Sequence, residues 1–448
     1  MKTKNVREHA FDALLKIENE EAYSNIIVNR VIEKGYFNEK DARLFTEMVY
    51  GTVQRKKTLD FILSRYLPKK IKKKDEWVRT LLRMAVYQMM YLDRIPDHAI
   101  LFESVKLAKK RGHRGLANLV NGILRNVQRS GLPDFKGIPD EAERLSVQYS
   151  HPTWLVSQWI EQYGMEQATH ICAANLERPS VAARVNGMKT TVSEVLPLLK
   201  KDGVIAERGS VSPDAIVVKK GNLIQTKAFK QGLVTIQDES SMLVGRAVNP
   251  QKGERILDCC AAPGGKTTHL AELMHNEGEI VALDIYEHKI KLIEQQLKRL
   301  KIANVTAERM DARDADKKFP NQSFDRILVD APCTGFGVLR RKPEIKWTKS
   351  EEDVLKMADL QLQILASVAP LLKRGGTLIY STCTIEPREN EQVIRSFLKQ
   401  HADFCRDSKL MERLPDKLAD HSKTIGEVQI LPHDFKSDGF FIAALRKK

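Results

Sequence analysis

The 448 residues of the chain are 42% hydrophobic and 29% charged, which argues against disorder and, at roughly 150 residues per domain, suggests two or three domains. The formal net charge is +15, and residues 1–140 hold 28 Lys and Arg against 17 Asp and Glu, so a nucleic-acid partner is expected, with a merely solvated lysine-rich surface as the alternative. Six cysteines exclude a dense disulfide framework, and neither a signal peptide nor a run of ~18 apolar residues is present, so a soluble cytoplasmic protein is expected.

The N-terminal third is predicted to be helical. Apolar residues recur at helical spacing at Val78, Leu81, Leu82, Ala85, Val86 and Met89, and residues 101–127 repeat the pattern. The lysines at 69, 70, 72, 73 and 74 indicate an exposed loop between helices, suited to phosphates or simply solvated. Residues 131–140 contain two prolines and two glycines, which are typical of a linker. We therefore place an all-α domain at 1–140.

A small α/β region is predicted next, at 141–235, with a helix near 154–163 and short strands near 182–185 and 215–218. Short apolar runs separated by amphipathic helices follow, at 255–258, 280–284, 305–310, 326–330 and 377–380. This alternation predicts an α/β, doubly wound parallel sheet in a domain at 236–448. Residues 428–431 and 440–445 are predicted to form a terminal hairpin.

The loop that follows the first predicted strand of this sheet is suited to bind a ligand. Its small residues and glycines allow backbone amides to approach a ligand at a helix N-terminus. A phosphate-binding loop is disfavoured because Cys260 stands where the first glycine of that motif belongs. Asp284 ends the second strand, where a carboxylate can bind ribose hydroxyls, and Asp311 ends the third, within reach of an adenine.

Two cysteines end neighbouring strands of the same predicted sheet. The fourth strand continues into Asp330, Ala331, Pro332 and Cys333, and the fifth into Ser381, Thr382, Cys383 and Thr384. In a sheet ordered 3-2-1-4-5-7-6 both thiols can face one pocket. Cytosine carbon 5 becomes nucleophilic only after a thiolate adds at carbon 6, and a second thiol can assist release, while Asp330 can position the cytosine amino group. The spacing alone does not decide which thiol attacks.

The other cysteines, Cys172, Cys259 and Cys405, are interpreted as structural. His269 and His288 have no second ligand at metal-site spacing, so no metal is expected. We also expect a monomer without a membrane partner.

Three motifs carry a resemblance to a known family: Cys-Ala-Ala-Pro-Gly-Gly-Lys at 260–266, Asp-Ala-Pro-Cys at 330–333 and Ser-Thr-Cys-Thr at 381–384. In this order they resemble the bacterial RNA 5-methylcytosine methyltransferases of the Sun/Fmu family, which includes enzymes of 16S ribosomal RNA, and the likeness covers essentially the whole chain. The helical third, at 82–85 and 120–126, resembles the RNA-binding NusB family. The resemblance implies a Rossmann-like class I methyltransferase fold with an RNA-binding linking subdomain.

The resemblance also implies roles for single residues. It makes Cys383 the nucleophile, Cys333 the group that serves as general base and assists product release, and 16S ribosomal RNA the partner. It places S-adenosyl-L-methionine against Cys260, Ala261, Ala262, Pro263, Gly264, Gly265, Lys266, Asp284, Asp311 and Asp330.

Two other hypotheses compete with this interpretation. The NusB-like helices can act in ribosome assembly or antitermination, with methylation secondary. An amine methyltransferase is disfavoured because Ala331, Pro332 and Cys333 stand where such enzymes carry an Asn/Asp-Pro-Pro-Tyr loop. For RNA engagement, the lysines at 69–74 and the basic run Lys109, Lys110, Arg111 and Arg114 are the predicted phosphate contacts.

Overall fold

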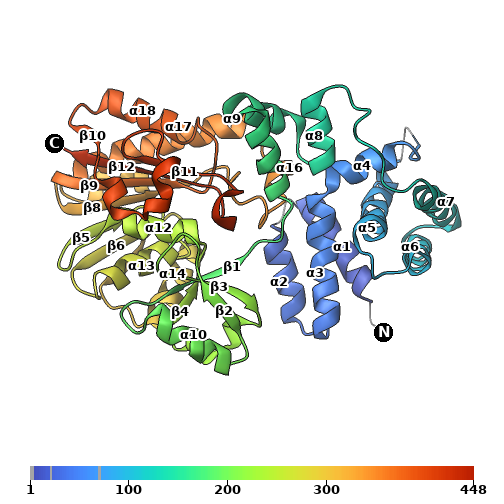
Figure 1. The fold of residues 1–448 in the computed structure, drawn as a ribbon, viewed down its shortest axis with the longest axis horizontal. Coiled ribbons are helices and arrows are strands. Elements are labelled where there is room, and N and C mark those ends of the chain that lie inside the picture. Colours follow the sequence, from blue (N-terminus) through green and yellow to red (C-terminus); the bar gives the residue numbers. More distant parts are fainter. Residues whose placement is uncertain (1–4, 21–22, 69–71) are drawn as a thin grey trace. The chain divides into compact units, whose positions relative to one another are not determined.

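The computed structural model describes residues 5–20, 23–68 and 72–448, and the chain divides into two compact units (Figure 1). Unit 1 extends to Glu177 and also contains Leu339–Thr348, and unit 2 contains Arg178–Val338 and Lys349–Lys448. The chain therefore leaves unit 2 after Val338, contributes ten residues to unit 1, and returns. Each unit has a hydrophobic core of its own.

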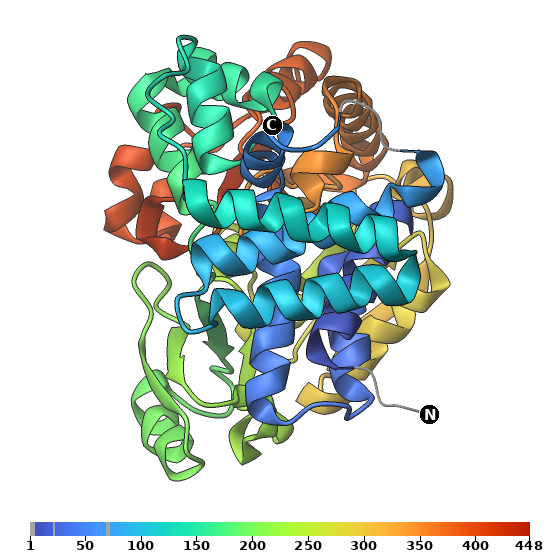
Figure 2. The same ribbon diagram turned by 90° about the vertical axis from the view of Figure 1, so that its right-hand side faces the viewer.

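Helices make up the described part of unit 1. They are α1 (Val6–Glu20), α2 (Ser24–Glu33), α3 (Glu39–Gln54), α4 (Lys56–Ser64), α5 (Trp77–Tyr91), α6 (Asp97–Arg111), α7 (Arg114–Ser130), α8 (Glu141–Tyr149), α9 (Thr153–Ala174) and α16 (Ile345–Thr348), with a short 3-10 turn, η1, at Lys73–Asp75. Helix α5 is central: its residues from Thr80 to Gln88 are all buried, so it packs on several neighbours. Helices α6 and α7 lie side by side and antiparallel, as Figure 2 shows in turquoise.

The segment Leu339–Thr348 is anchored to the helices of unit 1 by polar contacts. The indole Nε1 of Trp347 donates to the Val53 carbonyl at 2.8 Å, and the Lys346 Nζ donates to the Gln54 carbonyl at 2.9 Å. Lys346 is fully buried, and burial holds its pKa well below the ordinary value for lysine. These two hydrogen bonds satisfy backbone carbonyl groups in the last turn of helix α3.

Unit 2 begins with a small antiparallel sheet in the order β2-β3-β1-β4. Its elements are β1 (Val181–Val185), α10 (Val192–Lys201), β2 (Ile205–Arg208), β3 (Ala215–Lys220), α11 (Lys227–Lys230) and β4 (Val234–Ile236). Arg184 on β1 is fully buried and donates to the Glu272 carboxylate at 2.9 Å, to the Gly265 carbonyl at 2.8 Å and to Gln237. It thereby ties the small sheet to the loop and helix that follow β5 in the larger one.

The larger sheet of unit 2 has the order β10-β12-β9-β8-β5-β6-β7, and β11 also pairs with β12. The strands are β5 (Arg255–Asp258), β6 (Glu279–Asp284), β7 (Val305–Arg309), β8 (Phe324–Asp330), β9 (Leu372–Thr382), β10 (Phe404–Arg406), β11 (Glu427–Ile430) and β12 (Phe440–Lys447). Strands β5 to β9 pair in parallel, and β12 is antiparallel to β9. Numbered along the chain with β11 set aside, this is the order 3-2-1-4-5-7-6, so the predicted doubly wound α/β fold is confirmed.

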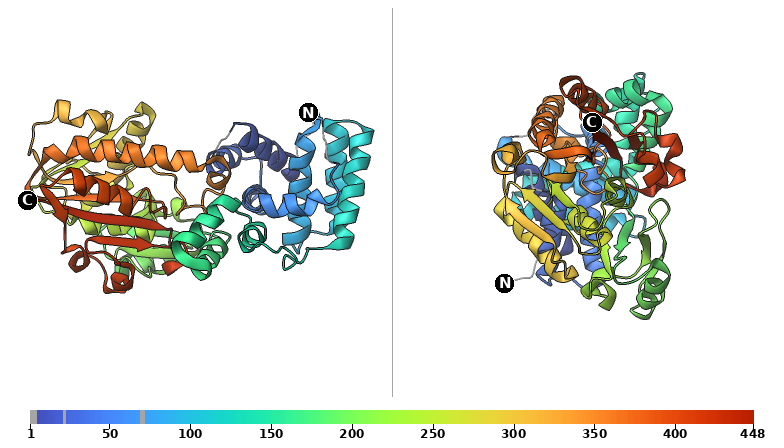
Figure 3. Two further views of the ribbon diagram at one scale, coloured as in Figure 1. Left: turned by 90° about the horizontal axis from the view of Figure 1, so that it is seen from above. Right: turned by 90° about the vertical axis from the view of Figure 1, so that its left-hand side faces the viewer.

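Helices complete the larger sheet: α12 (Glu239–Val248), α13 (Gly265–Leu273), α14 (Glu287–Leu300), α15 (Ala315–Lys318), α17 (Glu351–Val368), α18 (Glu391–Gln400) and α19 (Leu410–Arg413). The long helix α17 runs along the sheet, as the left view of Figure 3 shows in orange. Within the described chain, Glu351–Leu371 is the one stretch long and apolar enough to cross a membrane. Its residues Ile364, Leu365 and Val368 are buried in the sheet core, which is the packing of an ordinary core helix.

Most predicted elements are confirmed. The described part of the N-terminal third is helical, and the strands, the helix near 154–163 and the terminal hairpin are present. Strand β9 begins five residues before its predicted start because the polar stretch Lys373–Gly376 conceals it. Of the basic loop, 69–71 lie outside the described residues, while Lys73 and Lys74 belong to η1.

Candidate active site

The loop between β5 and α13 contains all seven residues predicted to contact a cofactor as a continuous motif, 260–266. Its backbone is anchored to the sheet because the Ala261 amide donates to the Leu283 carbonyl at 2.8 Å. Gly264 precedes α13 with φ +96°, and a Cβ there would lie 3.3 Å from the Ile293 backbone. Glycine is therefore required at this position for conformation and space. The free amides of the first turn of α13 follow directly, which suits a polar ligand.

Asp258, the last residue of β5, is a site residue that the sequence interpretation missed. Its side chain is fully buried, and its Oδ2 accepts a hydrogen bond from Thr267 Oγ1 at 2.7 Å. Its Oδ1 has no hydrogen-bond partner in the described chain. Burial raises the pKa of Asp258 to about 7, against the opposing effect of the Thr267 hydrogen bond. A buried carboxylate oxygen without a partner, beside a glycine-rich loop, is suited to a donor group of a bound ligand.

The predicted carboxylates Asp284 and Asp311 follow neighbouring strands. Asp284 is buried at the end of β6, accepts from the Tyr286 amide at 3.2 Å and lies 3.5 Å from the Lys289 Nζ. Asp311 lies two residues past Arg309, the residue that pairs with Asp284 in the parallel register of β6 and β7. Its carboxylate is held by Arg313, whose hydrogen bond lowers the pKa of Asp311. Both acidic groups thus lie at the carboxyl edge of the sheet, as predicted.

The two predicted thiols are brought together at the same edge. Residues Asp330 and Ser381 pair in the register of β8 and β9, and the Sγ atoms of Cys333 and Cys383 lie 3.4 Å apart. This is a contact between free thiols, since a disulfide bond would be about 2 Å long. The hydrogen bond between Cys333 and Cys383 and, next, burial raise the pKa of Cys333 well above that of an ordinary thiol. The raised pKa favours the protonated form of the Cys333 thiol.

Asp330 lies between the cofactor loop and the strand that leads to Cys383. Its Oδ2 accepts from Lys266 Nζ at 2.7 Å, and its Oδ1 accepts from Ser381 Oγ at 2.8 Å. The Lys266 Nζ also lies 5.1 Å from the centroid of the Phe440 ring. The Asp330 side chain is 26% exposed, so it remains accessible to a small ligand.

A buried carboxylate, Glu389, bonds to Thr334, the residue after Cys333. It accepts from the Thr334 amide at 2.9 Å, from the Thr334 hydroxyl and from Gln361 Nε2 at 3.1 Å. The hydroxyls of Thr334 and Thr384 lie 3.1 Å apart, so the network reaches both cysteine loops. Burial raises the pKa of Glu389 to about 7. No sequence pattern indicates this role, because the run 386–391 is rich in charges and is typical of an exposed turn.

The other three cysteines and His269 form no hydrogen bond with the residues of this network among the described contacts. Cys172 is buried in unit 1, and burial raises its pKa to about 12; burial also raises the pKa of Cys259. The Cys405 Sγ lies 3.7 Å from the Arg446 carbonyl. His269 is buried against Asp214, with Nε2 3.5 Å from the carboxylate, and burial lowers its pKa. Within the described residues, no three His, Cys, Asp or Glu side chains are grouped to hold a metal.

A sheet in this order, with a glycine-rich loop after its first strand and a carboxylate at the end of its second, defines the S-adenosylmethionine-dependent class of methyltransferases. Residues 246–446 match the family described as 16S rRNA methyltransferase RsmB/F, residues 4–129 match the NusB family, and residues 151–225 match the ferredoxin-like domain of RsmF/B-like methyltransferases. The chain belongs to the RsmB/F family of methyltransferases. The predicted resemblance, including its NusB-like part, is confirmed.

Similar proteins span the full chain. A Bacillus subtilis protein named "Probable ribosomal RNA small subunit methyltransferase B" is 48% identical over 100% of both chains, and a Synechocystis protein of the same name is 36% identical over 98% of this chain and 99% of its own. Among solved structures, PH0851 matches with a TM-score of 0.84 and 29% identity over 100% of this chain and 99% of its own. NSun6 from Pyrococcus horikoshii with SFG matches with a TM-score of 0.59 and 25% identity over 66% of this chain and 98% of its own.

Proposed function

We propose that the protein transfers a methyl group from S-adenosyl-L-methionine to carbon 5 of a cytosine in 16S ribosomal RNA, through a covalent adduct with Cys383. The observation that carries this proposal is the pair of thiols 3.4 Å apart at the ends of adjacent parallel strands. Family membership and the names of the relatives support ribosomal RNA as the substrate. An amine methyltransferase would have no use for two thiols at this place.

The residues around the β5–α13 loop fit the methyl donor. We assign its binding to residues 260–266, with Asp284 positioned for the ribose hydroxyls and Asp311 for the adenine. Asp258 supports the assignment because its partnerless buried Oδ1 can accept from the donor's ammonium group. When bound, S-adenosylmethionine supplies an electrophilic methyl group. Its positive charge also complements Asp258 and Asp330.

The first step that the residues perform is activation of the pyrimidine. The Cys383 sulfur, as thiolate, forms a bond to cytosine carbon 6, and the electron pair of the 5,6 double bond makes carbon 5 nucleophilic. Cys333 assists because it keeps its proton, and its S–H, 3.4 Å away, can stabilise the negative charge on the Cys383 sulfur. Asp330 can accept from the cytosine amino group or contact the methyl donor. The assignment of Cys383 as the nucleophile follows the family resemblance.

The second step releases the product. After methylation, carbon 5 still bears its proton; a base must take it so that the double bond re-forms and the carbon–sulfur bond to Cys383 breaks. The largest cause of the raised pKa of Cys333 is its hydrogen bond with Cys383. A thioether has no proton to share with Cys333, so formation of the adduct removes this one contribution to the raised pKa of Cys333. We therefore assign the proton removal to Cys333.

The test is methyl transfer from a radiolabelled donor to unmodified 16S ribosomal RNA, followed by digestion to nucleosides. We expect 5-methylcytidine from the wild-type protein, none from Cys383→Ala, and a slowly migrating protein–RNA adduct on denaturing gels from Cys333→Ala. Cys405→Ala is the matched control, since this cysteine contacts only a strand carbonyl of β12 in the described contacts. Full activity of Cys383→Ala, or a labelled nucleoside other than 5-methylcytidine, would refute the proposal.

The N-terminal parts are proposed to recognise the RNA. The matches to the NusB family and to the ferredoxin-like domain support the predicted division at 1–140, 141–235 and 236–448. Lys109 and Lys110 lie in the last turn of α6. Lys110 also pairs with Glu8 at 2.6 Å, so part of its charge is used within the protein. A cytoplasmic monomer remains our expectation.

A further inference from the structure

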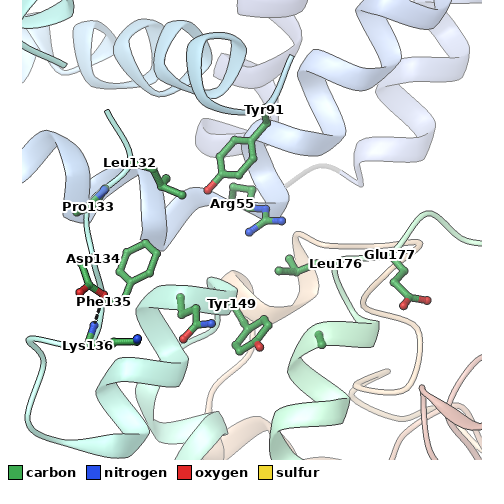
Figure 4. A pocket seen from close by; sticks show the side chains of 12 residues that line it. Arg55, Tyr91, Leu132, Pro133, Asp134, Phe135, Lys136, Tyr149, Leu176 and Glu177 are labelled. Carbon is green, nitrogen blue, oxygen red and sulfur yellow. Dashed lines mark hydrogen bonds between the residues drawn. The ribbon is translucent and has the colours of Figure 1, made fainter. Parts of the chain in front are cut away.

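A pocket in unit 1 is lined by none of the residues assigned to the proposed reaction. Residues from five segments line it: the α3–α4 junction, the end of α5, the 131–140 connection, the end of α8 and the end of α9. Its volume is about 610 Å³, within the roughly 300–1,000 Å³ of small-ligand sites. Figure 4 shows its side chains arranged around an open centre.

Three aromatic rings and two basic side chains dominate the lining: Tyr91, Phe135, Tyr149, Arg55 and Lys136. The Arg55 guanidinium lies 4.5 Å from the centroid of the Tyr91 ring (Figure 4). Burial raises the pKa of Tyr91 despite the nearby arginine, so this phenol stays neutral. Neither Arg55 nor Lys136 forms a salt bridge with any described residue. The pocket thus combines flat apolar faces with two basic groups that form no ion pair among the described contacts.

Two acidic side chains also line the pocket, and both are exposed at its rim. Asp134 accepts from the Lys136 backbone amide at 2.9 Å, which turns this carboxylate toward its own loop. Glu177 is the last residue of the first segment of unit 1. Neither carboxylate neutralises Arg55, and both are placed to accept from exocyclic amino groups.

The pocket is held in shape by contacts between segments about 90 to 120 residues apart. Gln54 Nε2 donates to the Asn175 carbonyl at 2.6 Å, and Thr58 Oγ1 donates to the Val147 carbonyl at 2.5 Å. The Lys57 amide donates to Ser150 Oγ at 2.9 Å. These contacts fix α8 and α9 against the α3–α4 junction. A ligand would therefore find a preformed site and lose little binding free energy to ordering it.

We infer that this pocket binds one unstacked nucleobase of a single-stranded RNA segment, with the adjoining phosphate held by Arg55 and Lys136. Proteins bind unstacked bases on aromatic and guanidinium planes, and every base has such a face. An apolar peptide side chain would leave the charge of Arg55 without a partner, whereas a nucleotide supplies both a ring and an anion. This inference depends on the proposed methylation of RNA, and it assigns the binding site of a base other than the target cytosine.

The experiment measures binding of a 12-nucleotide single-stranded RNA containing 2-aminopurine to the full-length protein. Stacking of this base on an aromatic ring quenches its fluorescence, and anisotropy reports the affinity. We expect Tyr149→Ala to weaken binding roughly 10-fold or more and to abolish the quench. Arg55→Gln should lower the slope of log affinity against log salt by roughly 0.7, the loss of one phosphate contact.

The matched control is Phe102→Ala, which removes an aromatic ring of α6 that is 65% exposed and does not line the pocket. Thermal unfolding of each variant shows whether the fold is retained, and Tyr149→Phe, which keeps the ring, should retain the quench. No quench with the wild-type protein, or equal quench in Tyr149→Ala and wild type, would overturn the inference. Methyl transfer at saturating ribosomal RNA reports on the active site separately, so failure of the pocket and failure of the proposed reaction are distinguishable.

Discussion

Replacing Glu389 by glutamine should disable the active site without touching either thiol. Glu389 accepts three hydrogen bonds, two from Thr334 and one from Gln361. A glutamine is uncharged and has one acceptor oxygen, so its NH2 group either faces the two N–H donors or replaces the oxygen that accepts from the Thr334 hydroxyl, which must then turn to accept. In both arrangements the hydrogen bonds to a carboxylate are lost or weakened. Hydrogen bonds to a charged group contribute about 1.5–3 kcal/mol each. We expect Thr334, and with it the adjoining Cys333, to shift, and transfer to slow about 10- to 100-fold.

The assay is single-turnover methyl transfer at saturating donor and RNA, which separates the chemical step from binding. Glu391→Gln is the matched control, since this residue is exposed at the start of α18. A Glu389→Gln protein that reacts within twofold of wild type would show that the network does not position the cysteine loops. Glu389→Asp keeps the negative charge but has a shorter side chain, so its rate of methyl transfer should lie between the rates of the wild type and of Glu389→Gln.

The same residue gives a pH dependence of stability. The pKa of Glu389 is raised from the ordinary 4.5 to about 7, so between these values the folded protein holds a proton that the unfolded chain has released. The free energy of unfolding should therefore decrease as pH rises from about 5 to 7, by at most about 3 kcal/mol. In denaturant titrations at several pH values, the free energy of unfolding of Glu389→Gln should decrease less with rising pH than that of the wild type. Asp258, whose pKa is also raised to about 7, should cause the decrease that remains. Equal slopes in both proteins would contradict the raised pKa.

Three further substitutions test the supports of the site. Gly337→Ala should abolish transfer, because its Cβ would lie 2.0 Å from the Gly439 carbonyl oxygen and 2.8 Å from that of Cys383, whereas Gly187→Ala, with open space around it, should be silent in the same assay. Arg184→Met should lower the free energy of unfolding by about 3–5 kcal/mol in denaturant titrations, since Glu272 is left charged and buried, and adding Glu272→Met should restore most of the loss. Trp347→Phe removes only the N–H that bonds to Val53 and should lower the midpoint of thermal unfolding by a few degrees; an unchanged midpoint would mean that this bond adds nothing.

The sequence predicted the larger sheet well because its central strands contain buried apolar residues, such as Ile256 and Leu257 of β5, whose limits agree with the predicted Arg255–Asp258. It also predicted the meeting of Cys333 and Cys383, since parallel strands end at one edge. It could not predict Glu389, because three hydrogen bonds of a buried carboxylate leave no local pattern. The chemical roles of the thiols and the exact domain limits remain predictions.

The return of the chain to unit 1 was also beyond prediction, and it bears on the reactive loop. Only residues 334–338 separate Cys333 from the segment Leu339–Thr348 that belongs to unit 1. Within these five residues, Thr334 bonds to Glu389, and the Gly337 amide donates to the Cys383 carbonyl at 3.0 Å. The peptide that carries Cys333 is thus fastened inside unit 2 and, a few residues later, by Trp347 and its neighbours inside unit 1. The contacts that hold Leu339–Thr348 in unit 1 therefore also limit the conformations of residues 334–338, which follow Cys333.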